Sequence, residues 1–238
     1  FPFSFPFPFP FLSPSSTQGY LRCARCLIAM GQLTPAKGQL AHVKRLDPSN
    51  GDVAKELASV ASAEREMELG RGYFANEDFR TARISFRRAL LLCPQAIDIQ
   101  LLQIEVVIGC GDFGEALNLT SAILRREAQS ARAMFLRGKA LYLSGSGDNI
   151  DKAIDHFKQA LQFDPDLSDA MKMAKKLRRL ANLKKEGNEA FKMGKMQEAR
   201  EKYTEALAVD PSHKLMCSTL CCNRAAALTK LKLLSEAI

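Results

Sequence analysis

The segment Lys195-Met-Gln-Glu-Ala-Arg-Glu-Lys-Tyr-Thr-Glu-Ala-Leu-Ala-Val-Asp-Pro211 decides the fold of this chain. Within it, Ala199, Tyr203 and Ala206 follow one another at spacings of 4 and 3 residues, so they share one face of a helix. Pro211 then ends the helix, because proline has no backbone N–H to donate and clashes with the preceding turn. The segment therefore predicts a helix with a narrow apolar face and a defined end.

The same pattern recurs along the chain. Short related segments end in an alanine at Ala36, Ala82, Ala116, Ala153, Ala199 and Ala237. The intervals between these alanines are 46, 34, 37, 46 and 38 residues. A proline follows twelve residues after four of them, at Pro48, Pro94, Pro165 and Pro211. Repetition with a period near 34 residues predicts helix-turn-helix units that stack on one another.

Two further positions are specified within each unit. A small residue stands in the first helix at Ala24, Gly70, Gly138, Gly187 and Ala225, with Ile104 as the exception. A large apolar residue stands four positions after the alanine at Leu40, Phe86, Phe157 and Tyr203, with Thr120 as the exception. We expect the two helices of a unit to approach closely at the small residue.

A helix-turn-helix unit with this spacing of small residues and proline resembles the tetratricopeptide repeat, and the resemblance covers residues 19–238. It implies an all-α fold, an α-solenoid of tetratricopeptide helix-turn-helix repeats, in which the inner helix face is offered to a partner.

Two of the intervals exceed the period by 12 residues, and the extra residues, 51–62 and 168–179, are compatible with helix. We expect each to extend or cap one stack before the next begins. The predicted division is a leader (1–18), the last repeat of a first group with its capping helix (19–62), a middle triplet with its linking helix (63–179), and the truncated start of a third group (180–238).

Residues 1–18 form a low-complexity segment that is not expected to fold. The Phe-Pro alternation that opens the chain excludes a helix. Phe, Pro, Ser and Leu can all be written with pyrimidine-only codons, which is typical of the end of an intron. We therefore expect a translated intron end, with the exon beginning near Gly19; a genuine disordered or hydrophobic leader is the alternative.

Composition narrows the class of protein. Of the 238 residues, 47% are hydrophobic and 25% charged, which favours a folded chain. Seven scattered cysteines do not form a disulfide framework, so a reducing compartment is expected, the cytoplasm and also the nucleus. His42, His156 and His213 lie near no nucleophile motif. We expect no catalytic activity, no cofactor and no metal, and the lack of a long apolar run predicts no membrane partner.

Three residues of the third group carry the functional prediction. Lys184 and Asn188 are one helical turn apart, and Asn223 stands at the corresponding face of the next repeat. They resemble the two-carboxylate clamp of chaperone-binding tetratricopeptide domains, which a Lys and an Arg from a third repeat complete. That second pair is expected beyond Ile238. Charged and amide donors of this kind suit the two carboxylates of a C-terminal Asp.

The first and middle groups differ in this respect. The first keeps Arg22 at a clamp position, although the matching Lys position holds Gln18. The middle triplet places Met67, Arg71, Leu102, Arg132 and Leu136 at the five clamp positions. We expect peptide binding by Lys184, Asn188, Asn223 and Arg22, and another task for the middle triplet.

Seven basic residues without an intervening acid precede and enter the clamp region: Lys172, Lys175, Lys176, Arg178, Arg179, Lys184 and Lys185. A solvated spacer helix is the first interpretation. Attraction of acidic chaperone tails is the second, and nucleic acid the third, because no aromatic residue alternates with these charges.

Clamp-bearing repeat groups around a clampless triplet resemble the DnaJ subfamily C member 7-like family of tetratricopeptide co-chaperones. The resemblance implies binding of the seventy- and ninety-kilodalton heat-shock chaperones through their acidic C-terminal tails, in support of protein folding, without nucleic acid. The alternatives are a targeting region of a phosphatase or prolyl isomerase whose catalytic domain is missing, and a repeat-only adaptor.

Overall fold

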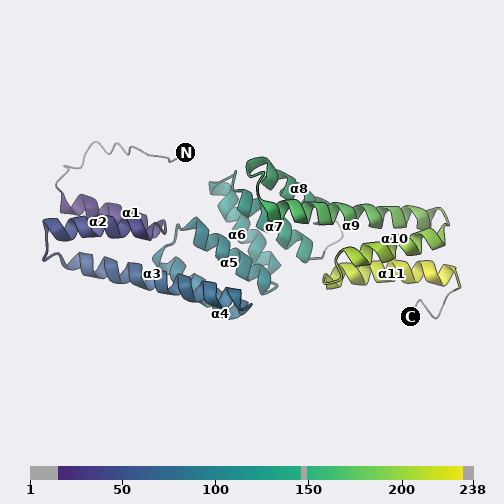
Figure 1. Ribbon diagram of the computed structural model, residues 1–238, viewed down its shortest axis with the longest axis horizontal. Helices are drawn as coiled ribbons and strands as arrows, with labels where there is room; N and C mark the ends of the chain where they lie inside the picture. The colour runs from purple at the N-terminus through teal and green to yellow at the C-terminus, as the bar shows by residue number, and fades with distance from the viewer. Residues whose placement is uncertain (1–15, 146–148, 233–238) are drawn as a thin grey trace. The chain divides into compact units, whose positions relative to one another are not determined.

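A computed structural model describes residues 16–145 and 149–232 of the chain. Within these ranges the backbone forms eleven helices and no strand (Figure 1), so the predicted all-α fold is confirmed. The chain divides after Cys110 into two compact units. Residues 1–15, most of the expected leader, and residues 233–238 lie outside the described ranges.

The first unit contains five helices, and the second contains six. The first unit comprises α1 (Thr17–Ala29), α2 (Leu33–Leu46), α3 (Gly51–Ala75), α4 (Phe79–Leu92) and α5 (Ile97–Gly109). The second unit comprises α6 (Phe113–Arg126), α7 (Ala131–Leu143), α8 (Asn149–Phe163), α9 (Ser168–Lys192), α10 (Met196–Val209) and α11 (Lys214–Lys230). Within each unit, helices that follow one another in the chain pack against each other.

The turn inside a helical hairpin uses a residue with left-handed backbone. Gly194 has a φ of 79° between α9 and α10, and the Lys195 N–H donates to the carbonyl oxygen of Ala190 at 2.9 Å. This bond satisfies one of the carbonyls that a helix end leaves unpaired. Glu77 takes the same conformation between α3 and α4, with a φ of 59°. The connections are therefore short, and the two helices of a hairpin run antiparallel.

The close approach expected inside each hairpin is present in three of them. A Cβ atom on Gly70 would lie 2.7 Å from the ring of Phe86, and one on Gly187 would lie 2.7 Å from the ring of Tyr203. Gly138 and Phe157 repeat this geometry at 2.7 Å. Real Cβ contacts do not occur at such distances, so only glycine permits these helix spacings.

The two twelve-residue insertions are helical, as predicted, and neither stands alone. Residues 51–62 form the first half of α3, and residues 168–179 form the first half of α9. Each continues without a break into the first helix of the following repeat, so α3 and α9 are both 25 residues long. The predicted group boundaries at 62 and 179 fall inside these helices, and the division into groups stays a prediction.

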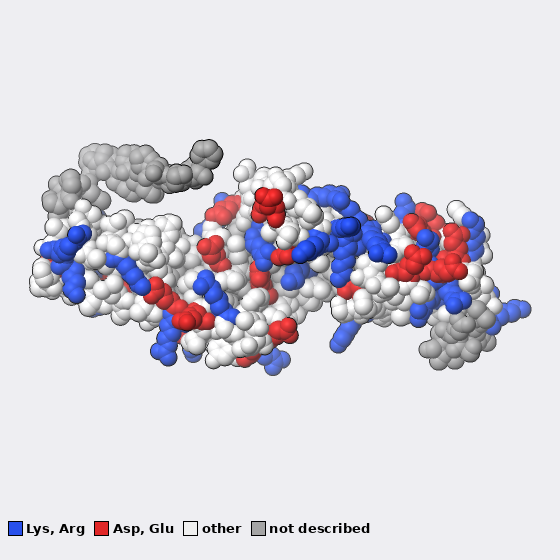
Figure 2. Space-filling view, viewed as in Figure 1, with Lys and Arg blue, Asp and Glu red and all other residues white. Residues whose placement is uncertain are grey.

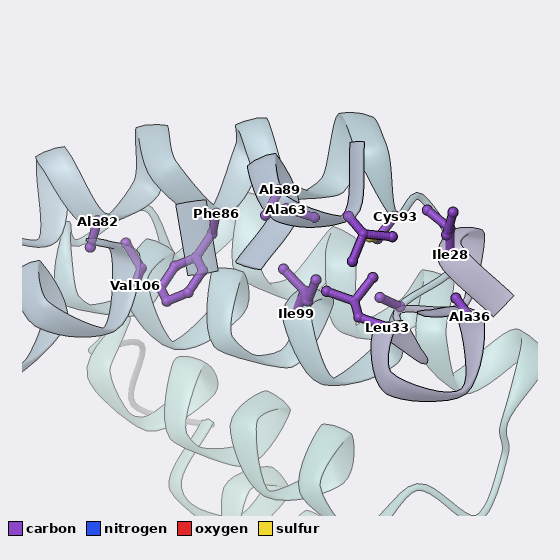
Figure 3. Close-up of a cluster of buried hydrophobic side chains, with 12 residues drawn as sticks. Ile28, Leu33, Ala36, Ala63, Ala82, Phe86, Ala89, Cys93, Ile99 and Val106 are labelled. Carbon is purple, nitrogen blue, oxygen red and sulfur yellow. The ribbon is translucent and has the colours of Figure 1, made fainter. Parts of the chain in front are cut away.

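The core of the first unit lies around α3, α4 and α5. Phe86 is fully buried beside Val106, and Cys93 and Ile99 continue the cluster (Figure 3). Leu33 and Ala36 of α2 join the same cluster. The Gln95 N–H also donates to the carbonyl oxygen of Ala29 at 2.8 Å, which ties the α4–α5 turn to the end of α1.

In the second unit, a buried polar network ties the turn between α10 and α11 to an earlier helix. The Tyr142 hydroxyl at the end of α7 donates to Asp210 Oδ2 at 2.7 Å, and His213 Nε2 lies 2.9 Å from the Tyr142 carbonyl oxygen. Lys176 Nζ of α9 lies 2.8 Å from the same Asp210 oxygen. We call Tyr142, Lys176, Asp210 and His213 the polar joint. It connects α7, the middle of α9 and the α10–α11 turn.

The carboxylate of the polar joint is held in its charged form. Burial on its own would raise the pKa of Asp210, but hydrogen bonds from Lys176, Tyr142 and Ser212 outweigh it and lower that pKa. Burial, followed by the hydrogen bond to Asp210, raises the pKa of Tyr142 far above its ordinary value. Asp210 therefore accepts and Tyr142 donates throughout the neutral range.

Candidate functional site

Helices α9 and α11 carry three of the predicted residues. Lys184 and Asn188 lie one turn apart on the second half of α9, and Asn223 lies on α11. Helix α10 packs against both of these helices. Gly187, next to Asn188, lets α10 approach α9 closely, so the packing of the repeat also sets where Asn188 stands.

Hydrogen bonds orient the Asn188 amide. Asn223 Nδ2 donates to Asn188 Oδ1 at 3.4 Å, and the Tyr203 hydroxyl donates to the same oxygen at 2.8 Å. With its oxygen engaged by two donors, Asn188 has its Nδ2 group left to donate. Within the described ranges, that Nδ2 donates to no protein acceptor, so it is available to an external carboxylate.

Two adjoining hollows share Asn188. The larger, about 430 Å³, is lined by side chains of α9 and the start of α8: Ile150, Asp151, Ala181, Asn182, Lys184, Lys185, Asn188, Glu189 and Lys192. The smaller, about 230 Å³, is lined by Asn188, Phe191, Lys192, Tyr203, Asn223 and Ala226. We call the two together the α9–α11 groove. Its Lys and Asn side chains outnumber its two carboxylates, Asp151 and Glu189, and this excess of donors suits a carboxylate ligand.

An aromatic and a cation close one end of the groove. Lys230 Nζ lies 4.3 Å from the centre of the Phe191 ring, within the range of a cation–π contact. Phe191 also lines the smaller hollow. The pair places a positive charge and an apolar surface side by side, next to the Asn188 and Asn223 amides.

Tyr203 belongs to this site, although the sequence predicts only a packing role for it. Burial raises the pKa of Tyr203, so its hydroxyl stays protonated and can donate to Asn188. A signal was present in the sequence, because the same position holds Leu40, Phe86 and Phe157 in other units. Only this unit combines a ring with a hydroxyl, and only here does an Asn follow the glycine.

Arg22 stands apart from these residues. It lies on α1 in the first unit, is exposed, and is one turn from the exposed Gln18. Neighbouring Arg25 pairs with Glu56 at 2.6 Å and with Asp52 at 3.2 Å. Arg22 therefore lies in a different unit from Lys184, Asn188 and Asn223, and its role stays a prediction.

The clamp positions of the predicted middle triplet are occupied differently. Met67 and Leu102 pack against the core of the first unit, and Leu136 is fully buried in α7. Arg132 pairs with Asp169 at 3.3 Å and lies 5.1 Å from the centre of the Phe135 ring. These four positions contribute packing or an internal ion pair, and the fifth, Arg71, is exposed; none of the five is an amide donor.

Within residues 16–145 and 149–232, no three His, Cys, Asp or Glu side chains stand close enough to hold a metal ion. None of the helices in the same ranges combines the length and apolar character needed to cross a membrane.

Comparison with known proteins defines the class. A tetratricopeptide-repeat family model matches residues 109–168. The crystal structure of the P58(IPK) TPR domain superposes with a TM-score of 0.62 at 18% identity, over 94% of this chain and 62% of that one. Together with the helical hairpins, these matches show that the chain has the tetratricopeptide-repeat fold.

The relatives confirm the resemblance drawn from the sequence. The chain is 32% identical to DnaJ homolog subfamily C member 7 of Homo sapiens, over 95% of this chain and 45% of that protein. It is 40% identical to the Schizosaccharomyces pombe homolog over 58% of this chain and 28% of that protein. It is 32% identical to the Hsp70-Hsp90 organizing protein of Triticum aestivum over 75% of this chain and 34% of that protein. The chain spans less than half the length of these curated relatives.

Proposed function

We propose that this chain is a co-chaperone scaffold that binds the acidic C-terminal tails of the seventy- and ninety-kilodalton heat-shock chaperones at the α9–α11 groove. The observation that carries the proposal is the convergence of Lys184, Asn188 and Asn223, with the Asn188 amide oriented by two hydrogen bonds. The similarity to DnaJ homologues and to an Hsp70-Hsp90 organizing protein supports the same class of partner.

The donors match the chemistry of a C-terminal aspartate. Such a residue presents an α-carboxylate and a side-chain carboxylate a few ångströms apart, and both are charged at neutral pH. The Lys184 ammonium and the free Asn188 amino group are one helical turn apart, so each can serve a different carboxylate oxygen. Charge-assisted hydrogen bonds of this kind contribute about 1.5–3 kcal/mol each.

Peptide binding to the full chain tests the proposal. The probe is a fluorescent peptide that ends in Glu-Glu-Val-Asp, and its affinity is measured by polarisation. We expect Lys184→Ala and Asn188→Ala each to weaken binding about tenfold or more, since each removes one charge-assisted hydrogen bond. Amidation of the peptide's C-terminus should have a similar effect.

A lysine outside the groove provides the matched control. Lys152 is exposed on α8 and forms no ion pair within the described ranges, so Lys152→Ala should leave the affinity unchanged. Binding that survives both Lys184→Ala and Asn188→Ala, or that ignores amidation of the peptide, would refute the assigned site.

A further inference from the structure

The most strongly charged surface of the second unit lies along α9. Between residues 172 and 185 the helix carries seven basic residues and no acidic one: Lys172, Lys175, Lys176, Arg178, Arg179, Lys184 and Lys185. Figure 2 shows a band of Lys and Arg over the first half of this helix. Seven positive charges within about 20 Å of helix produce a strong local field.

Four of these side chains have no internal acidic partner. Lys172, Lys175, Arg178 and Arg179 are exposed, and none forms an ion pair within the part of the chain that the structure describes. Lys176 differs from them, because its ammonium group is committed to Asp210 in the polar joint at 2.8 Å. We call the four exposed residues the basic face.

Several basic residues elsewhere in the described ranges have acidic partners. Lys37 pairs with Glu64 at 2.6 Å, and Lys202 pairs with Glu186 at 2.9 Å. Like charges three or four residues apart on a helix destabilise it by about 0.2–0.5 kcal/mol per pair. The basic face carries this cost without internal compensation, and an external anionic partner would provide compensation.

The basic face is continuous with the α9–α11 groove. Arg178, Asn182 and Lys185 follow one another at spacings of 4 and 3 residues, so they lie on one side of α9. Asn182 and Lys185 line the larger hollow together with Lys184 and Asn188. Residues on the same side of the helix therefore lead from the proposed carboxylate site to Arg178 and the rest of the basic face.

We propose that the basic face binds an acidic, extended segment of the same peptide whose C-terminus is held in the groove. This inference rests on the proposed function. Asn188 is 10 residues from Arg178 and 13 from Lys175, which corresponds to about 15–20 Å along the helix axis. An extended peptide covers that distance in about four to six residues. Acidic residues about four to six positions before the C-terminal residue are therefore the ones that the basic face would contact.

An acidic polypeptide fits this surface better than nucleic acid does. Single-stranded nucleic acid is bound by basic grooves that also carry aromatic side chains for base stacking. No aromatic residue stands between residues 170 and 186, so this part of α9 contributes charge alone. Charge without stacking suits a chain of carboxylates, which offers no flat ring to cover.

Two peptides with the same last four residues test the inference on the full chain. Both end in Glu-Glu-Val-Asp; one is preceded by four Asp residues and the other by four Ser residues. We expect the acidic peptide to bind about tenfold more tightly at low salt, and the gain to shrink as salt rises. The triple variant Lys175→Ala/Arg178→Ala/Arg179→Ala should remove most of this gain and leave the affinity for the Ser-extended peptide unchanged.

A charge-matched triple variant is the control. Lys44, Lys55 and Arg87 are exposed residues of the first unit, and their replacement by Ala should preserve the gain. Circular dichroism checks that both variants keep their helices. The inference is overturned if the Asp extension adds no affinity, if the gain survives the α9 triple variant, or if a single-stranded oligonucleotide of equal charge competes as well as the acidic peptide.

The same titrations separate the two proposals. If both Lys184→Ala and Asn188→Ala leave the affinity for the Ser-extended peptide unchanged, the proposed carboxylate site is wrong. If the Asp-dependent gain is nevertheless lost in the α9 triple variant, the basic face is an acidic-peptide surface in its own right, and only its link to the groove is overturned.

Discussion

The two long helices, α3 and α9, solve the same packing problem. Both are 25 residues long, and each runs from an inserted half into the first helix of a repeat. A Cβ atom added to Gly70 on α3 would lie 2.7 Å from the ring of Phe86, and one added to Gly187 on α9 would lie 2.7 Å from the ring of Tyr203. The positions that determine helix spacing are therefore equivalent in the two units.

The inner faces of the same helices differ. At the positions next to the shared packing contacts, α3 carries Met67 and Arg71, whereas α9 carries Lys184 and Asn188. Met67 packs against the core of its unit, but Lys184 and Asn188 line the α9–α11 groove. The comparison teaches that packing constrains the glycine and ring positions of the repeat, whereas the neighbouring positions can carry either apolar or ligand-binding side chains.

The connections that secure α3 and α9 differ as well. Around α3, Cys93 and Ala96 are buried in an apolar cluster. The equivalent positions around α9 hold Asp210 and His213 of the polar joint. The turn after α4, which we call the apolar joint, is thus stabilised by the burial of Cys93 and Ala96, whereas the polar joint is stabilised by charge-assisted hydrogen bonds. The stability of the two joints should respond differently to mutation and to pH.

The largest expected effect tests whether the glycine–ring packing contributes equally to stability at α3 and at α9. Gly70→Val and Gly187→Val should each lower the free energy of unfolding by about 3 kcal/mol, because the added side chain meets an aromatic ring in a closely packed interface. Gly72→Val is the control, since a Cβ atom there meets nothing within 4 Å, and it should change stability by less than about 0.5 kcal/mol. Chemical denaturation measures all three. If the loss in free energy of unfolding differs between Gly70→Val and Gly187→Val, the two helices are not packed equivalently.

The next effect concerns the polar joint alone. Asp210→Ala should lower the free energy of unfolding by about 2 kcal/mol, because it leaves the Tyr142 hydroxyl and the Lys176 ammonium without their acceptor. The value lies below that of a fully buried pair because Lys176 is 34% exposed. Asp164 precedes the proline of the previous repeat, and within residues 16–145 and 149–232 its side chain accepts only from the Asp166 N–H, at 3.1 Å. Asp164→Ala should therefore cost much less; an equal cost would show that the joint adds nothing.

The sequence was sufficient for the repeat and insufficient for the polar joint. A period near 34 residues and the glycine–ring pairs have local signatures, and the geometry of Gly70 and Gly187 confirms them. Tyr142 and Asp210 are 68 residues apart, so their contact has no periodic signature. One unit departs from this pattern in a way that the sequence also shows. It carries Ile104 at the position where other units have a small residue, and Thr120 at the position where most have a large apolar one.

The candidate site was only partly predictable for the same reason. Lys184 and Asn188 share a helix, so their proximity follows from a spacing of four residues. The orientation of the Asn188 amide depends on Tyr203 and Asn223, which lie on two other helices. Sequence periodicity assigns Tyr203 to the core and says nothing about where its hydroxyl points.

A smaller effect tests Tyr203 as a positioning residue. Tyr203→Phe keeps the ring against Gly187 and removes the donor to Asn188 Oδ1, so the affinity for the Glu-Glu-Val-Asp peptide should fall about fivefold, near 1 kcal/mol. In an Asn188→Ala background the same change should have no further effect, as a double-mutant cycle measures. Tyr73→Phe, at an exposed tyrosine of α3, is the control. An unaltered affinity for Tyr203→Phe would remove Tyr203 from the site.

The smallest effect is a pH dependence that separates the two joints. Because the folded-state pKa of Asp210 is lowered, the stability that its ionisation contributes is present above the ordinary Asp value of 3.8 and is lost as the pH falls through the folded-state pKa. The stability difference between the unaltered chain and Asp210→Asn should therefore be constant near pH 6 and narrow below 3.8. Burial raises the pKa of Cys93, so its thiol stays neutral across this range and the cost of Cys93→Ala should not change. Narrowing in both variants would mean that general acid unfolding, rather than Asp210, produces the effect, and the contrast between a charged and an apolar joint would fail.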